Sequence, residues 1–260
     1  MQERHQNKLQ YFNEQSYTTE NHVIPYIHNF FVPAPGKTVM EIGCGEGGNL
    51  KPFLDKGCLV IGIDISVSRI EKAHEFLSGH PNYNNLTLID KDIYDVDFSA
   101  LPPIDLIFLR DTIEHIPDQS RLISFFRSIL TPEGKIFIAF PPWHMPFGGH
   151  QQICKNRILS KMPYFHILPG FLYRGILKIF GENKRTIEDL REIKDTGISI
   201  QRLKKYVKKS NYKIVKQTYF FINPNYEVKF KLKTRKLLFF NHIPLLRDFF
   251  TTAYYCIITV

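Results

Sequence analysis

The sequence predicts an α/β fold in which a mainly parallel β-sheet carries helices on both faces. Two observations lead to this prediction. From residue 37 to residue 141, short apolar runs alternate with helical patterns of apolar residues. The strand-like runs are also rich in Val, Ile, Leu and Phe throughout, which is typical of strands that helices bury from both sides. With 260 residues, 43% hydrophobic and 23% charged, the composition indicates one globular domain and excludes disordered, collagen-like and coiled-coil proteins.

The expected elements follow one another along the chain. A strand at 37–42 leads into a short helix from about residue 48, and a strand at 59–63 leads into a helix at 66–77. Next come strands at 86–89 and 104–109, a helix at 117–130, a turn over 131–134 and a strand at 135–140. A helix at 199–210 and strands at 212–221 and 253–260 complete the pattern, and a helix at 19–31 precedes it.

These elements divide the single domain, residues 1–260, into four parts. Residues 1–36 form an N-terminal helical extension, and residues 37–141 form the core that we expect to bind a cofactor. Residues 142–198, in which Gly and Pro interrupt apolar and basic stretches, are interpreted as an inserted cover over the substrate. Residues 199–260 hold the last helix and strands, with a basic insertion at 223–250.

The cysteines and the apolar runs indicate the compartment. No run approaches the 18 or more apolar residues of a membrane span, and the first ten residues are too polar for a secretory signal. The four cysteines contain no CxxC pair, so they indicate neither a disulfide framework nor a zinc site. We therefore expect a cytoplasmic protein with no bound metal.

Charge is distributed unevenly between the two parts of the chain. Residues 1–149 hold 12 Lys and Arg against 18 Asp and Glu, a net −6, whereas residues 150–260 hold 22 against 7, a net +15. The basic part is suited to an anionic partner such as phosphate, a lipid headgroup or nucleic acid. A merely solubilising surface is the alternative. We expect a weak contact with an anionic membrane surface and consider nucleic acid a less favoured partner; the oligomeric state is left open.

A glycine-rich loop between the first strand and the first helix indicates a nucleotide-type cofactor. Gly43, Gly45 and Gly48 satisfy GxGxxG, the pattern that brings a pyrophosphate onto a helix N-terminus in dinucleotide sites. Here, however, Glu41 precedes the loop and Glu46 lies inside it. Because carboxylates oppose a pyrophosphate but tolerate ammonium and sulfonium groups, the acidic loop favours S-adenosylmethionine over NAD.

Two further carboxylates follow the next strands. Asp64 ends the second strand, 21 residues after Gly43, where it can accept both ribose hydroxyl protons. Asp92 follows the third strand and is positioned for the adenine amino group, with Ile93 packing on the ring. In open α/β sheets, ligands bind at the carboxyl ends of the strands.

Five segments together resemble the class I S-adenosylmethionine-dependent methyltransferases, and most closely their small-molecule branch. They are VMEIGCGEGG, VIGIDIS, LIDKDIYD, IDLIFLRDTIEHIPD and ILTPEGKIFIAF, in the family's order over residues 37–141. The resemblance implies a Rossmann-like, doubly wound sheet of seven strands, mostly parallel, with an antiparallel last strand. It implies that strands 212–221 and 253–260 form the antiparallel edge pair; the family connects this pair tightly, so residues 223–250 depart from its pattern.

The expected cofactor-binding residues are those of the loop and of the strand ends. They are Glu41, Gly43, Cys44, Gly45, Gly47, Asp64, Ile65, Asp92, Ile93, Arg110 and Asp111. Each also has a structural interpretation: an Asp at a strand end often caps a helix, Cys44 can be a small core filler, and Asp111, Glu114 and His115 can cap and solvate the start of a helix.

The segment FPPWHMPFGGHQQ, residues 140–152, leaves the fifth strand toward the expected acceptor. Its Pro-Pro-Trp follows the fifth rather than the fourth strand and lacks a leading Asn or Asp, which disfavours a nucleobase amine as acceptor. His150 and His144 in this segment, and His115 after the fourth strand, are the candidate catalytic bases.

The resemblance and these residues favour a methyltransferase that acts on a small or lipid-like acceptor by in-line displacement at O, N or C. Three alternatives stay open: a methyltransferase of RNA or another polyanion, an NAD-dependent oxidoreductase, and a binding protein that keeps the fold without catalysis.

Overall fold

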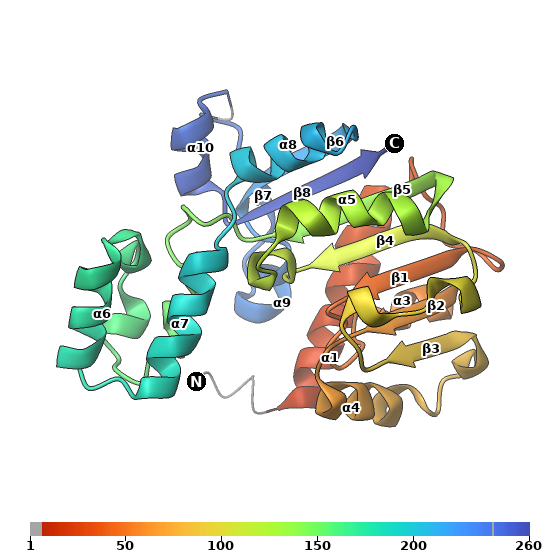
Figure 1. The fold of residues 1–260 in the computed structure, drawn as a ribbon, viewed down its shortest axis with the longest axis horizontal. Coiled ribbons are helices and arrows are strands. Elements are labelled where there is room, and N and C mark those ends of the chain that lie inside the picture. Colours follow the sequence, from red (N-terminus) through yellow and green to blue (C-terminus); the bar gives the residue numbers. More distant parts are fainter. Residues whose placement is uncertain (1–6, 241) are drawn as a thin grey trace.

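One eight-stranded sheet runs through the computed structural model, which describes residues 7–240 and 242–260 (Figure 1). The strand order is β3-β2-β1-β4-β5-β8-β6-β7. The strands are β1 (Thr38–Ile42), β2 (Leu59–Ile63), β3 (Leu86–Ile89), β4 (Ile104–Arg110), β5 (Leu130–Phe140), β6 (Lys213–Ile222), β7 (Arg235–Lys236) and β8 (Ala253–Thr259). The expectation of seven strands is wrong by one, because the basic insertion supplies the two-residue strand β7 at the edge of β6.

The pairing agrees with the expected mostly parallel sheet. β1 pairs in parallel with β2 and β4, β2 with β3, and β4 with β5. β8 runs antiparallel to both β5 and β6, so the predicted antiparallel pair of the last two long strands is confirmed. β5 begins at Leu130, which places the turn expected over 131–134 inside the strand; the pairing of β4 and β5 is irregular there, between Ile104 and Leu106.

Helices cover both faces of the sheet. The α-helices are α1 (Lys8–Thr18), α2 (Ile24–Ile27), α3 (Lys51–Asp55), α4 (Val67–Leu77), α5 (Gln119–Ile129), α6 (Gly170–Ile179), α7 (Lys184–Thr196), α8 (Ile200–Lys209), α9 (Asn225–Phe230) and α10 (Pro244–Phe250). Val39 of β1 faces the core cluster that includes residues of α2, α3 and α4, whereas its neighbour Met40 faces the cluster with α5 and α8. Since successive side chains of a strand point to opposite faces, a strand that is apolar throughout is buried from both sides.

The N-terminal helix begins earlier than expected. The segment predicted as a helix at 19–31 is helical over Thr19–Val23, as a π-helical turn, and over Ile24–Ile27, as α2, and α1 precedes both. α1 buries polar residues, Glu14 and Thr18, as well as Phe12. Because its contact face is partly polar, apolar periodicity could not locate it. Residues 1–6 of the predicted extension lie outside the described residues.

The inserted cover is more regular than its sequence suggests. Short 3₁₀ turns at Gln151–Ile153, Leu159–Lys161 and Phe165–Ile167 precede α6 and α7, and Pro169 immediately precedes α6. Cys154, Leu159, Phe165, Tyr173, Leu177 and Leu190 form a separate apolar cluster. In Figure 1, α6 and α7 stand beside the sheet, beyond the carboxyl ends of its parallel strands.

The insertion at 223–250 also contains short elements, namely α9, β7 and α10. Residue 241 of this insertion lies outside the described residues. Within the described chain, no helix combines the length and the apolar character that crossing a bilayer requires.

Candidate active site

The glycine loop follows β1 and turns sharply at three glycines with positive φ, Gly43 (71°), Gly45 (54°) and Gly47 (82°). A Cβ on Gly43 would lie 2.5 Å from a side-chain carbon of Thr112, so the loop packs closely on the segment after β4. A Cβ on Gly45 would meet no atom within 4 Å. The loop is therefore closed on one side and open at Gly45, where a ligand can approach the backbone.

Asp64 anchors this loop to the end of β2. Its carboxylate accepts hydrogen bonds from the backbone N–H groups of Gly45 and Ser66, each at 2.9 Å. Ile65, the next residue, is 77% exposed although it follows a buried strand. The loop, a buried carboxylate and an exposed apolar side chain therefore lie together at this edge of the sheet.

Glu41 is buried beneath the loop. The Asn49 side-chain amide donates to one Glu41 carboxylate oxygen at 2.6 Å, and the other oxygen has no hydrogen-bond partner among the described residues. Burial raises the pKa of Glu41 well above its usual value. Cys44 is buried as well, and a Cβ on Gly62 would lie 2.9 Å from its sulfur. Burial raises the pKa of the Cys44 thiol, so the structure places Cys44 as a packed filler of the loop.

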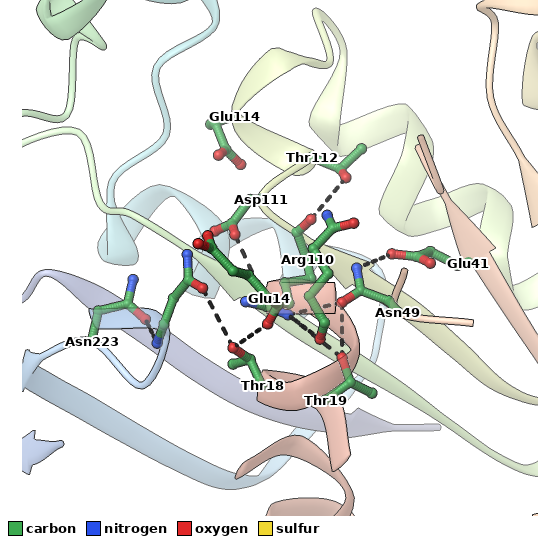
Figure 2. A network of polar contacts seen from close by, with 12 residues as sticks. Glu14, Thr18, Thr19, Glu41, Asn49, Arg110, Asp111, Thr112, Glu114 and Asn223 are labelled. Carbon is green, nitrogen blue, oxygen red and sulfur yellow. Dashed lines mark hydrogen bonds and ion pairs between the residues drawn. The ribbon is translucent and has the colours of Figure 1, made fainter. Parts of the chain in front are cut away.

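Arg110 connects the loop to the N-terminal helices (Figure 2). Its Nη1 donates to the Asn49 side-chain oxygen at 2.8 Å and to the Gln15 carbonyl at 3.4 Å. The Thr19 hydroxyl donates to the same Asn49 oxygen at 2.8 Å. Arg110, expected to contact the cofactor, is thus buried in a network that holds α1 and the π-helical turn against the loop.

Further contacts place α1 directly on the loop. The Lys8 ammonium pairs with the Glu46 carboxylate, and a Cβ on Gly48 would lie 2.5 Å from the Phe12 carbonyl oxygen. Burial, together with the nearby charge of Asp111, raises the pKa of Tyr11 to about 12. The N-terminal helix therefore packs on the glycine loop and forms a wall beside it, a contact that sequence reasoning missed because it is polar and long-range.

Asp92 and Ile93, the two predicted cofactor residues after β3, differ in burial. Asp92 is exposed, and its carboxylate accepts a hydrogen bond from the Tyr94 backbone N–H at 3.0 Å. Ile93 is buried in the core cluster behind the sheet. Asp92 is therefore accessible to a ligand, whereas Ile93 is mostly buried against other core residues.

The segment after β4 carries a buried acid. Asp111 has a positive φ of 54°, and its N–H bonds the Ala139 carbonyl of β5 at 2.9 Å. Glu114, within the 3₁₀ turn Ile113–His115, is 3% exposed, and neither of its carboxylate oxygens has a hydrogen-bond partner in the described part of the chain. Burial, and after it the charge of Asp111, raises the pKa of Glu114 well above its usual value. Sequence reasoning left two interpretations of Glu114 open, a residue that caps and solvates a helix start or one that contacts the cofactor or the substrate.

The structure brings two of the three candidate histidines together. The rings of His115 and His150 lie 5.1 Å apart, and burial lowers the pKa of His115. His144 lies elsewhere: its Nδ1 is 4.0 Å from Asp248, and its ring is 5.6 Å from that of Phe249. Glu114, His115 and His150 therefore lie together, and His144 does not join them.

A fourth histidine, His166, supports this region from behind. It is fully buried, and its Nε2 lies 2.7 Å from the Trp143 carbonyl oxygen. Burial lowers the pKa of His166 to about 4, so its ring is neutral in the folded protein. A Cβ on Gly149 would lie 2.1 Å from the His166 Cβ. The close approach explains why glycine precedes His150.

The family and the relatives reported below, to which this chain is similar, are methyltransferases by name. Residues 15–217 match the family described as "Methyltransferase domain". The chain is 34% identical over 109 residues to phosphoethanolamine N-methyltransferase 2 of Caenorhabditis elegans, which covers 40% of this chain and 24% of that protein. It is 31% identical over 132 residues to the ubiquinone biosynthesis O-methyltransferase of Pasteurella multocida, and this match covers 46% of this chain and 54% of that protein. The chain thus spans less than two thirds of the length of these relatives.

A solved structure supports the fold. The magnesium protoporphyrin IX methyltransferase of Synechocystis, crystallised with bound SAH, superposes with a TM-score of 0.54 at 16% identity, covering 96% of this chain and 86% of that one.

Proposed function

The chain belongs to the family of methyltransferase domains, and on that premise we propose that it transfers a methyl group from S-adenosylmethionine to a small or lipid-like acceptor. The observation that carries this proposal is the convergence of the open Gly45, the Asp64 carboxylate and the exposed Ile65 at one edge of the sheet. Ligands of open α/β sheets bind at this edge.

The chemistry of the loop fits this cofactor. Glu46 and Asp64 place acidic groups beside it, which suits a cofactor that carries ammonium and sulfonium charges, and Glu41 lies buried beneath it. One Asp64 oxygen accepts a hydrogen bond from the loop and the other accepts one from Ser66. A carboxylate offers about four lone pairs in all. The remaining sites are suited to ribose hydroxyls, and Ile65 to the adenine ring. When bound, the cofactor supplies an electrophilic methyl group.

Other expected cofactor residues act through the loop. Asn49 stands between Glu41 and Arg110, so these two side chains hold the loop and the wall formed by α1. Exclusion of water by that wall and a fixed position of the acceptor are the main contributions that a methyl transfer needs from the protein. His115 and His150, whose rings lie 5.1 Å apart, would orient the acceptor and its proton.

The nature of the acceptor is proposed from the relatives and from the cover. By their names, the two relatives act on phosphoethanolamine and in ubiquinone biosynthesis, that is, on small or lipid-like molecules. On α6, Phe171 and Ile179 are 76% and 82% exposed, and Arg174 and Lys178 of the same helix are also exposed. Exposed apolar and basic side chains on one helix support a weak contact with an anionic membrane surface. The four buried, unpaired cysteines support a reducing, cytoplasmic compartment.

Two measurements test this proposal. S-adenosylhomocysteine at about 100 times its dissociation constant should stabilise the fold by about 2.7 kcal/mol, while NAD should leave the melting temperature unchanged. Incubation of the full chain with methyl-tritiated cofactor and a cell extract should label the small-molecule or lipid fraction. Stabilisation by NAD alone would support an oxidoreductase, and label confined to RNA would support the polyanion alternative.

A further inference from the structure

We propose that Glu114, His115 and His150 form a binding site for a divalent transition-metal ion beside the methyl acceptor. One ligand atom from each of these side chains lies within 4.8 Å of the other two. The proposal rests on the function proposed above and deepens it, because a metal at this position favours an acceptor that presents an oxygen atom. Sequence reasoning expected no metal, since it relied on cysteine spacing.

Glu114 provides the first independent support. Its carboxylate is 3% exposed, and both oxygens lack a hydrogen-bond partner among the residues that the structure describes. Figure 2 shows it above Asp111, with no dashed line reaching it. A buried carboxylate without a hydrogen-bond partner is costly. The His115 Nε2 lies 4.0 Å from one of its oxygens, and Asp111, the charged neighbour that acts on it, carries the same sign. A cation bound here would offset both the cost of burying the carboxylate and its repulsion by Asp111.

The position of His150 provides the second support. Its φ of 53° is left-handed, a conformation that costs free energy in a residue other than glycine. Gly149 leaves no room for a side chain against His166, and His166 in turn contacts the Trp143 carbonyl. His150 is therefore held 35 residues along the chain from His115, with the two rings 5.1 Å apart.

The donor set selects the kind of metal. One carboxylate oxygen and two imidazole nitrogens suit Zn²⁺, Mn²⁺ or Fe²⁺, whereas Mg²⁺ and Ca²⁺ prefer oxygen donors. Three protein ligands leave at least one position for water or a substrate. Tetrahedral donors bonded at about 2.0–2.2 Å to one ion are about 3.3–3.6 Å apart, so metal binding would draw the three side chains closer together.

The site lies close to the glycine loop. Glu114 follows Thr112, whose side chain packs on Gly43 of the glycine loop. A hydroxylated acceptor bound to the metal through its oxygen would lose its proton to water near neutral pH, because a cation lowers the pKa of a bound O–H group. The oxygen then forms a bond to the methyl carbon as the sulfonium C–S bond breaks. The electron pair of that bond stays on sulfur, and S-adenosylhomocysteine leaves as a neutral thioether.

The test uses the full chain after removal of metals with EDTA. Zn²⁺, Mn²⁺ and Mg²⁺ are titrated separately by calorimetry, with and without S-adenosylhomocysteine. We expect one Zn²⁺ or Mn²⁺ per chain and much weaker Mg²⁺ binding. Glu114→Gln, which preserves shape, and His150→Ala should each weaken binding at least 10-fold, as loss of a ligand does. Glu75→Gln and His74→Ala, two exposed residues of α4, are the matched controls and should bind as the wild type does.

Cofactor binding separates the two proposals. S-adenosylhomocysteine should bind Glu114→Gln with wild-type affinity, which also shows that the variant is folded. No stoichiometric transition-metal binding, or binding that the Glu114 and His150 variants retain, would overturn the metal site. Failure of the wild type to bind S-adenosylhomocysteine would instead overturn the proposed function.

Discussion

Replacement of Gly48 by alanine tests whether the N-terminal helix is a wall of the cofactor site. The added Cβ would lie 2.5 Å from the Phe12 carbonyl oxygen and 2.8 Å from the Gln15 Cβ, both on α1. Ordinary contact begins at 3.4 Å, so α1 and the loop must separate by roughly 0.9 Å, which is overpacking at a closely packed contact. Gly48 is absent from the residues with positive φ, so the cost is steric rather than conformational.

We expect this substitution to destabilise the fold by about 1–3 kcal/mol, the usual cost of overpacking. For a chain of this size, each kcal/mol corresponds to about 2–4 °C in melting temperature. Because Asn49 follows Gly48 and bonds both Arg110 and Thr19, movement of α1 should also weaken the binding of S-adenosylhomocysteine.

Urea denaturation and calorimetric titration of S-adenosylhomocysteine measure the two effects. Gly79→Ala is the control, because a Cβ at residue 79 meets no atom within 4 Å and its φ is not positive. Its stability should stay within about 0.5 kcal/mol of the wild type. If the Gly48 and Gly79 variants are equally stable and bind the ligand equally, α1 does not pack on the loop and the reasoning fails.

Three further predictions concern the carboxylate and the histidines. Asp64→Ala should lower the affinity for S-adenosylhomocysteine at least 10-fold and lower the free energy of unfolding by about 2–4 kcal/mol, because two backbone N–H bonds to its carboxylate are lost. Asp92→Ala loses one exposed hydrogen bond and should keep wild-type stability. Equal effects of the two substitutions would contradict the proposed role of Asp64 in holding the loop and the cofactor. The pKa of His166 is about 4 in the folded protein and about 6.5 in the unfolded chain, so the unfolded state binds the extra proton. Its contribution to stability is therefore complete above pH 6.5 and is lost as the pH falls toward 4, by about 2 kcal/mol at pH 5. In urea denaturation at several pH values, His166→Gln should lack this part of the fall in the free energy of unfolding. His150→Ala should lower turnover in a methyl-transfer assay about 10²- to 10⁴-fold. His144→Ala should lower it much less, because His144 packs against α10. Equal losses in the two variants would show that the proximity of His150 to His115 is irrelevant to catalysis.

The sequence by itself determined the sheet and the place of the cofactor loop. Runs such as Leu59–Ile63 are apolar at every position, and local chain geometry then requires a strand buried on both faces. Asp64 follows that strand directly, so its position at the strand end follows from adjacency along the chain. The positive φ of Gly45 is equally local, because glycine is the residue that adopts it without cost.

Tertiary structure alone decided the contacts between residues far apart in the chain. The position of α1 depends on polar contacts of Lys8 with Glu46, which follows β1, and of Gln15 with Arg110, the last residue of β4; no apolar periodicity encodes these contacts. The strand β7 exists only because the insertion returns to the edge of β6. Likewise, Glu114 becomes an unpartnered buried acid, and His150 its neighbour, only when the segment after β5 folds back over the end of β4. Local sequence specifies dihedral preferences and buried faces, whereas the meeting of these side chains is set by how distant segments pack against one another.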